Sequence, residues 1–184
     1  MKLAVRLFFI FTLSIALYAC ASSKKNNDLQ YNADYPLYTS DTEKFKFSET
    51  DKALDKVFAA NLPVVLFIHG RGNEPKKSLT GGTFVEGNAV KKLEDQYKIK
   101  VLLFNWNSKA AGMYDRSAPL SHMTEAADSL KKVLTEFKSY FKKSENKNRK
   151  ITLLVHSMGS IVLQTYVQQN LQKNALLESN QALF

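Results

Sequence analysis

Ser157 stands between two stretches whose patterns of apolar residues differ. The stretch before it, Ile151 to Val155, is a short apolar run typical of a strand, and the apolar residues after it recur with helical spacing. A serine on such a strand-to-helix turn can attack a carbonyl carbon, because the start of the helix offers unpaired amides and a positive dipole end to the oxyanion that forms. Serine is also common at helix N-termini, so a capping role is the alternative.

The residues around Ser157 resemble the nucleophile elbow of the α/β-hydrolase family, G-x-S-x-G. His156, Ser157, Met158 and Gly159 match that motif, and Val155 replaces its first glycine. Gly159 is expected where the helix and strand backbones pass so closely that a β-carbon would collide. The resemblance implies that Ser157 is the catalytic nucleophile of a serine hydrolase.

A second motif, His69-Gly70-Arg71, follows the apolar run from Pro63 to Ile68 and is similar to the H-G-x segment of the same family. In the family, the amide of the residue after the H-G pair forms half of the oxyanion hole. The resemblance therefore implies that the amides of Arg71 and Met158 stabilise the oxyanion. One such donor typically lowers the barrier by about 3 kcal/mol.

The segment from Leu103 to Ser108 looks like the F-x-W-P-S segment after the fourth strand in a poorly characterised bacterial subgroup of α/β-hydrolases, with Asn107 in place of proline. Tyr114, Asp115 and the long helix expected after them fit the same subgroup. The resemblance extends from about Pro63 to Gln172.

A serine nucleophile needs a histidine base and an acid, which follow the serine along the chain in this family. From Met158 to Phe184 there is no histidine and no aspartate, and Glu178 is the only acid. The candidates that precede the serine, against the family order, are His122, Asp115 and Asp128. We therefore expect the chain to be the N-terminal part of a longer hydrolase, truncated at its C-terminus and inactive by itself.

The elements that must position these residues form an alternating pattern of strands and helices. Continuous apolar runs predict buried strands at Pro63 to Ile68, Lys100 to Phe104, and Ile151 to Val155. Helical spacing predicts helices at Thr83 to Tyr97, Ser121 to Phe141, and Ser157 to about Gln172. The alternation indicates an α/β fold with a mostly parallel sheet and helices on both faces. The resemblance implies an α/β-hydrolase fold whose C-terminal strands are missing.

The N-terminus predicts secretion. Residues 1–19 combine Lys2 and Arg6 with an apolar stretch, as in a signal peptide. The residues up to Cys20 resemble the bacterial lipobox, which implies that Cys20 carries the lipid; an ordinary signal peptide is the alternative. Residues 20–43 are then a polar tether and residues 44–184 the hydrolase domain, with a short edge strand near residues 44–47. Ala21 favours sorting to the outer membrane, facing the periplasm.

The composition excludes several other classes of protein. The formal net charge is +9, but the lysine pairs are not interleaved with aromatic residues as in a nucleic-acid site. A single cysteine excludes a disulfide framework, and the three histidines lack the clustering of a metal site. A phosphate-binding loop also fails, since Pro75 and Lys77 stand where its second glycine is required after Gly70 or Gly72.

The remaining polar residues have modest expected roles. Ser121 is expected to cap the helix that follows it, where Glu125 adds favourable charge. His122 is expected to be exposed or capping, and His69 and His156 to pack and shape their loops. No cofactor is expected.

The sequence therefore predicts a membrane-anchored serine hydrolase that acts on ester or thioester bonds of lipids or acylated small molecules. The alternative is a non-catalytic envelope lipoprotein that uses the same fold as a binding module.

Overall fold

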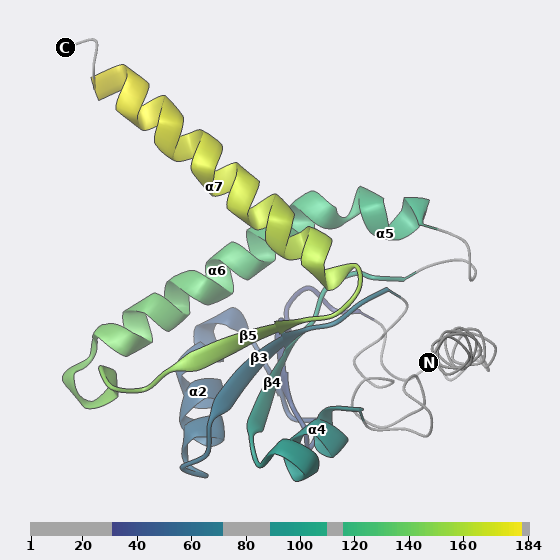
Figure 1. The fold of residues 1–184 in the computed structure, drawn as a ribbon, viewed down its shortest axis with the longest axis vertical. Helices are drawn as coiled ribbons and strands as arrows, with labels where there is room; N and C mark the ends of the chain where they lie inside the picture. Colours follow the sequence, from purple (N-terminus) through teal and green to yellow (C-terminus); the bar gives the residue numbers. More distant parts are fainter. Residues whose placement is uncertain (1–30, 72–88, 110–115, 182–184) are drawn as a thin grey trace, which may run out of the picture.

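The computed structural model describes residues 31–71, 89–109 and 116–181, and a five-stranded sheet lies at its centre (Figure 1). The strand order is β2-β1-β4-β3-β5. The strands are β1 (Leu37–Thr39), β2 (Lys44–Phe45), β3 (Val64–Ile68), β4 (Lys100–Phe104) and β5 (Ile151–Val155). The central strand β3 runs parallel to β4 and β5, whereas β1 is antiparallel to both β4 and β2. The predicted α/β fold is confirmed, and the sheet is mixed, with β3, β4 and β5 parallel to one another.

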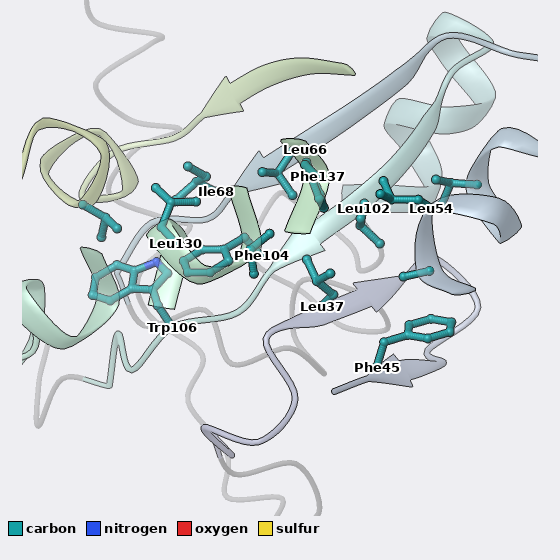
Figure 2. Packing of buried hydrophobic residues seen from close by; sticks show 14 of the residues in the cluster. Leu37, Phe45, Leu54, Leu66, Ile68, Leu102, Phe104, Trp106, Leu130 and Phe137 are labelled. Atoms are coloured by element: carbon teal, nitrogen blue, oxygen red, sulfur yellow. The ribbon is translucent and has the colours of Figure 1, made fainter. Parts of the chain in front are cut away.

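Helices cover both faces of the sheet. They are α2 (Thr50–Phe58), α4 (Ala89–Tyr97), α5 (Ser117–Ser121), α6 (Met123–Lys142) and α7 (Gly159–Gln181), with short 3₁₀ turns η1 (Phe47–Glu49) and η2 (Ser144–Asn146). Apolar residues of α2, α6 and the start of α7 pack on one face, in the larger core shown in Figure 2. A smaller core, with Phe67 and Leu103 of the sheet and Val90 of α4, lies on the other face. Beyond its first turns α7 extends away from the sheet (Figure 1).

Helix α6 confirms the periodicity expected between residues 121 and 141. Its buried residues are Met123, Ala126, Ala127, Leu130, Val133, Phe137 and Tyr140. The prediction that Ser121 caps this helix is wrong, because His122 occupies the N-cap position of α6. Ser121 is instead the last residue of the short helix α5, and its hydroxyl donates to the carbonyl of Ala118 at 2.7 Å. Glu125 does lie in the first turn of α6.

The predicted start of the first helix, near Thr83, lies outside the described residues, and α4 is described from Ala89 to Tyr97. The bounds of α7 differ from expectation. Helix α7 begins at Gly159, after the turn that holds Ser157, and extends to Gln181. None of the described helices has the length and apolar character needed to cross a membrane.

The boundary between tether and domain at residue 44 is wrong. Leu37 and Tyr38 are buried, and β1 pairs with β4 so that Leu37 lies opposite Phe104. Residues assigned to the tether therefore form an inner strand of the sheet, since β1 lies between β2 and β4. In this position β1 protects the edge of β4 from solvent. The short strand expected near residues 44–47 is present as β2, at the edge of the sheet. The predicted signal peptide and Cys20 lie outside the described residues.

Strand β5 is also less buried than its apolar sequence predicts. It pairs with β3 alone among the described strands and lies at the end of the sheet. Leu153 and Leu154 point to opposite faces and are 41% and 38% exposed. A strand is buried on both faces only where helices and neighbouring strands cover it, and the described helices cover β5 incompletely.

Candidate functional site

The two sequence motifs lie side by side at the carboxyl edge of the sheet. Ile68 of β3 is paired in register with Val155 of β5, so the segments that follow these strands are neighbours. The amide of His156 donates to the carbonyl of Ile68 at 3.0 Å, which joins the two segments directly. The helices that follow, α4 and α7, pack on opposite faces of the sheet. Such a switch point is where open α/β sheets bind ligands.

Ser157 lies on a sharp turn between β5 and α7. Its φ angle is 53°, in the left-handed region that costs a residue with a β-carbon about 1–2 kcal/mol. The turn is closed by the amide of Gly159, which donates to the carbonyl of His156 at 2.9 Å, and by the amide of Ser160, which donates to that of Ser157 at 3.0 Å. The side chain of Ser157 is exposed. Val155, which replaces the first glycine of the motif, ends β5 without preventing this turn.

Two glycines allow the segments to pack this closely. A β-carbon on Gly159 would lie 2.4 Å from the carbonyl oxygen of Ile68 and 2.7 Å from that of His69. A β-carbon on Gly70 would lie 2.8 Å from Cβ of Ser157. The contacts of Gly159 are with backbone atoms, which cannot rotate away. The close approach of helix and strand expected from the sequence is therefore present, and Gly159 maintains it.

His69 is completely buried and has the contacts of a structural residue. Its Nδ1 donates to the carbonyl of Gly70 at 2.8 Å, and the Trp106 amide donates to its Nε2 at 3.5 Å, which assigns a neutral tautomer. Burial lowers the pKa of His69 to about 4. The ring of Trp106 stacks on that of His69, and the Trp106 indole donates to the carbonyl of His69 at 2.8 Å. The geometry supports packing and loop shaping, as expected from the sequence.

Trp106 and Asn105 have a positioning role that the sequence indicated only through the F-x-W motif. Trp106 is buried and belongs to the larger core, together with Leu130 and Ile68 (Figure 2). The amide of Asn105 donates to the carbonyl of Pro36 at 2.8 Å, which joins the end of β4 to the segment before β1. Trp106 therefore holds the loop that carries His69, and Asn105 holds the end of β4 from which Trp106 follows.

The amides expected to form the oxyanion hole belong to Met158 and Arg71. Met158 lies between the serine and the first residue of α7, and its amide donates to no carbonyl of the described backbone. An amide at this position of a helix start is available to a ligand oxygen. Arg71 follows Gly70 and lines the same pocket as Ser157 and Met158. The pairing of these two amides around an oxyanion stays a prediction.

A pocket of about 360 Å³ opens beside Ser157. The described residues that line it are Arg71, Arg116, Leu120, Ser157, Met158, Ser160 and Ile161. Arg116 and Leu120 come from the start and the body of α5, a short helix that the sequence did not reveal because its few residues carry no helical apolar pattern. The serine hydroxyl therefore shares a pocket with cationic and apolar side chains.

The described residues that line the pocket include neither a histidine nor a carboxylate. His122 occupies the N-cap position of α6, but its side chain forms no capping hydrogen bond, and its Nδ1 lies 3.6 Å from the carboxylate of Glu125. His156 is half-buried, and burial lowers its pKa. Asp128 is exposed on α6, and Asp115 and Tyr114 lie outside the described residues. In the described part of the chain, no three His, Cys, Asp or Glu side chains are grouped to hold a metal ion.

Comparisons with known proteins give the family of the chain. No curated protein and no solved structure matched it. A family model described as "Alpha/beta hydrolase of unknown function" matches residues 39–181, which include both motifs and every strand that surrounds the site. The chain therefore belongs to this family of α/β-hydrolases of unknown function, DUF900.

Proposed function

We propose that this protein is a serine hydrolase that cleaves ester or thioester bonds by acyl transfer to Ser157. The observation that carries the proposal is the left-handed turn at Ser157, which exposes the hydroxyl beside the His69-Gly70 segment and at the mouth of a pocket. A strained backbone at a residue with a β-carbon is typical of functional sites. A residue that only capped α7 would gain nothing from this conformation.

The proposed reaction has two steps. The oxygen of Ser157 attacks the carbonyl carbon, loses its proton to a base, and forms a tetrahedral oxyanion that the amides of Met158 and Arg71 stabilise. Collapse of this species expels the protonated alcohol or thiol and leaves an acyl-enzyme. Water then attacks the acyl-enzyme, and the carboxylic acid and the free serine are formed. The described residues do not identify the base.

A fluorophosphonate probe tests the proposed nucleophile. We expect the complete natural protein to be labelled at Ser157, as read by mass spectrometry of its peptides, and we expect Ser157→Ala to abolish the labelling. Ser139→Ala is the matched control, because Ser139 is an exposed serine on α6 outside the pocket, and this variant should be labelled at the unchanged rate. Absence of labelling in the folded natural protein would exclude the proposed chemistry.

The second candidate is a binding module without catalysis. It is favoured by the pocket beside Ser157, because its described lining includes neither a histidine nor a carboxylate. This candidate requires that a folded protein be unlabelled by the probe and that its cellular role survive Ser157→Ala.

We also propose that Cys20 carries a lipid that attaches the protein to the bacterial cell envelope, in the outer membrane. The support is the sequence of residues 1–20, which combines a basic start, an apolar stretch and a cysteine. Acyl chains contribute about 0.8 kcal/mol for each methylene buried in the membrane. The mass of the N-terminal peptide would show the lipid, and Cys20→Ser would abolish it.

A further inference from the structure

Two arginines line the pocket beside Ser157. Arg71 follows β3, and Arg116 immediately precedes α5, so the two cations reach the pocket from separate segments of the chain. No described aspartate or glutamate lines the pocket. A concave site with charges of one sign attracts ligands of the other sign.

Arg116 differs from the arginine that supports the fold. The guanidinium of Arg149 lies over the rings of Phe58 and Tyr140 and pairs with Asp55 at 3.5 Å. Arg116 is exposed and forms no ion pair with a carboxylate of the described residues. Its planar group carries a full charge at every physiological pH and can hold two oxygens of one carboxylate or phosphate.

The rest of the described lining consists of three aliphatic residues and two serines. Leu120, Met158 and Ile161 contribute aliphatic side chains, and Leu120 is 47% exposed. Burial of aliphatic surface by a ligand adds about 25 cal/mol for each Å² removed from water. The same pocket can therefore hold an anionic group and a short apolar group together.

We propose that the pocket selects an ester that carries a carboxylate or phosphate next to an apolar group, and that Arg116 binds the anionic group. The proposal deepens the proposed function and rests on it, because the pocket is the one from which Ser157 would attack. Arg116 determines specificity, whereas the Ser157 turn and the two amides act on the scissile carbonyl.

Binding of small anions tests this without requiring turnover. The probes are butyl phosphate and butyrate, with butyramide as the neutral equivalent of butyrate and inorganic phosphate as the anion without an apolar group. Affinities are measured by NMR titration of the full chain in low salt. We expect butyl phosphate and butyrate to bind more tightly than butyramide, and butyl phosphate more tightly than inorganic phosphate. A preference for one of the two anionic probes identifies the group as phosphate or carboxylate.

Variants of Arg116 give the decisive comparison. We expect Arg116→Gln to decrease the affinity for butyl phosphate and butyrate by about tenfold, the usual effect of losing a charged hydrogen bond. The affinity for butyramide should not change. Arg116→Lys keeps the charge and should retain part of the affinity. Lys138→Gln removes the same charge from an exposed site on α6 and should change nothing. Equal effects of Arg116→Gln and Lys138→Gln, or equal binding of butyrate and butyramide, would overturn the proposal.

The outcomes separate this proposal from that of the nucleophile. If the probe labels Ser157 but binding does not depend on the charge of the ligand, the proposed serine hydrolase is retained and the proposed anionic specificity is overturned. Binding that depends on Arg116 in a protein that the fluorophosphonate does not label would retain an anion-binding pocket and overturn the hydrolase, and the anionic ligand would then not be a substrate.

Discussion

Ser157 has a backbone conformation that is favourable for its reactivity and unfavourable for stability. Its φ angle of 53° brings Cβ close to the peptide carbonyl, which glycine would avoid. The turn persists because the pairing of β5 with β3 and the start of α7 determine the chain on both sides. At this residue, glycine would therefore favour the stability of the fold, whereas catalysis requires the hydroxyl of serine.

We expect Ser157→Gly to be more stable than Ser157→Ala. Both variants lose the hydroxyl, but alanine keeps the strain and glycine relieves it, so their free energies of unfolding should differ by about 1 kcal/mol. Urea denaturation of the two variants measures the difference. Equal stabilities would show that the left-handed conformation costs nothing in this protein.

At the scale of elements, His69 joins the ends of β3 and β4. Its ring stacks on Trp106, and Trp106 donates two hydrogen bonds to His69, from its amide to Nε2 and from its indole to the backbone carbonyl. Protonation of the Nε2 atom would remove the acceptor that the Trp106 amide uses. One of the two hydrogen bonds between the strand ends therefore depends on a neutral imidazole.

This contact should make stability depend on pH. The pKa of His69 is about 4 in the folded state because of burial, whereas the ordinary value in an unfolded chain is 6.5. Between these values the unfolded state binds the proton and the folded state does not. The contribution of His69 is therefore fully present above pH 6.5, decreases as pH falls from 6.5 to 4, and amounts to about 3 kcal/mol at most.

Urea denaturation between pH 4.5 and 7.5 checks this prediction. We expect the free energy of unfolding to increase with pH in the natural chain and to increase less steeply in His69→Gln. Ser139→Ala is the control, because Ser139 is exposed on α6 and has no group that titrates in this range, so this variant should leave the slope unchanged. Identical slopes for His69→Gln and the natural chain would contradict the assigned cause.

At the scale of the whole molecule, the sheet is protected unequally at its two sides. At one side, β1 covers the edge of β4, and the edge strand β2 has only two residues. At the other side, β5 presents exposed leucines on both faces and pairs with no second strand among the described residues. An apolar edge strand with unpaired backbone groups is a template for association between chains.

We therefore expect Leu154→Lys to decrease self-association of this chain. A lysine on an edge strand opposes pairing with another strand, and Leu154 is exposed enough that the free energy of unfolding should change by no more than about 1 kcal/mol. Sedimentation velocity over a range of concentrations measures the effect. Leu171→Lys on α7 is the control, since Leu171 is 63% exposed but belongs to a helix without an unpaired edge. An equal effect of both substitutions would indicate general hydrophobic association instead.

Much of the fold and of the site followed from local patterns. The sequence predicted the strands at residues 64–68 and 100–104 and the long helix α6. A strand buried on both faces leaves a continuous apolar run, and a helix buried on one face leaves apolar residues at helical spacing. Helix α2 was missed although Ala53, Leu54 and Val57 recur at helical spacing in its sequence. Strand β1 and helix α5 were missed because they have too few residues to show a pattern. The pocket cation Arg116 was missed for the same reason, since it precedes α5.

The sequence by itself determined the α/β fold, the position of Ser157 on a strand-to-helix turn and the need for glycine at residue 159, because each of these depends on residues adjacent along the chain. Only the tertiary structure decided which residues share the pocket, that β1 belongs to the sheet, that β5 lies at an edge, and that His69 is held neutral against Trp106. These properties depend on contacts between residues far apart in the chain, and burial and pKa arise from those contacts.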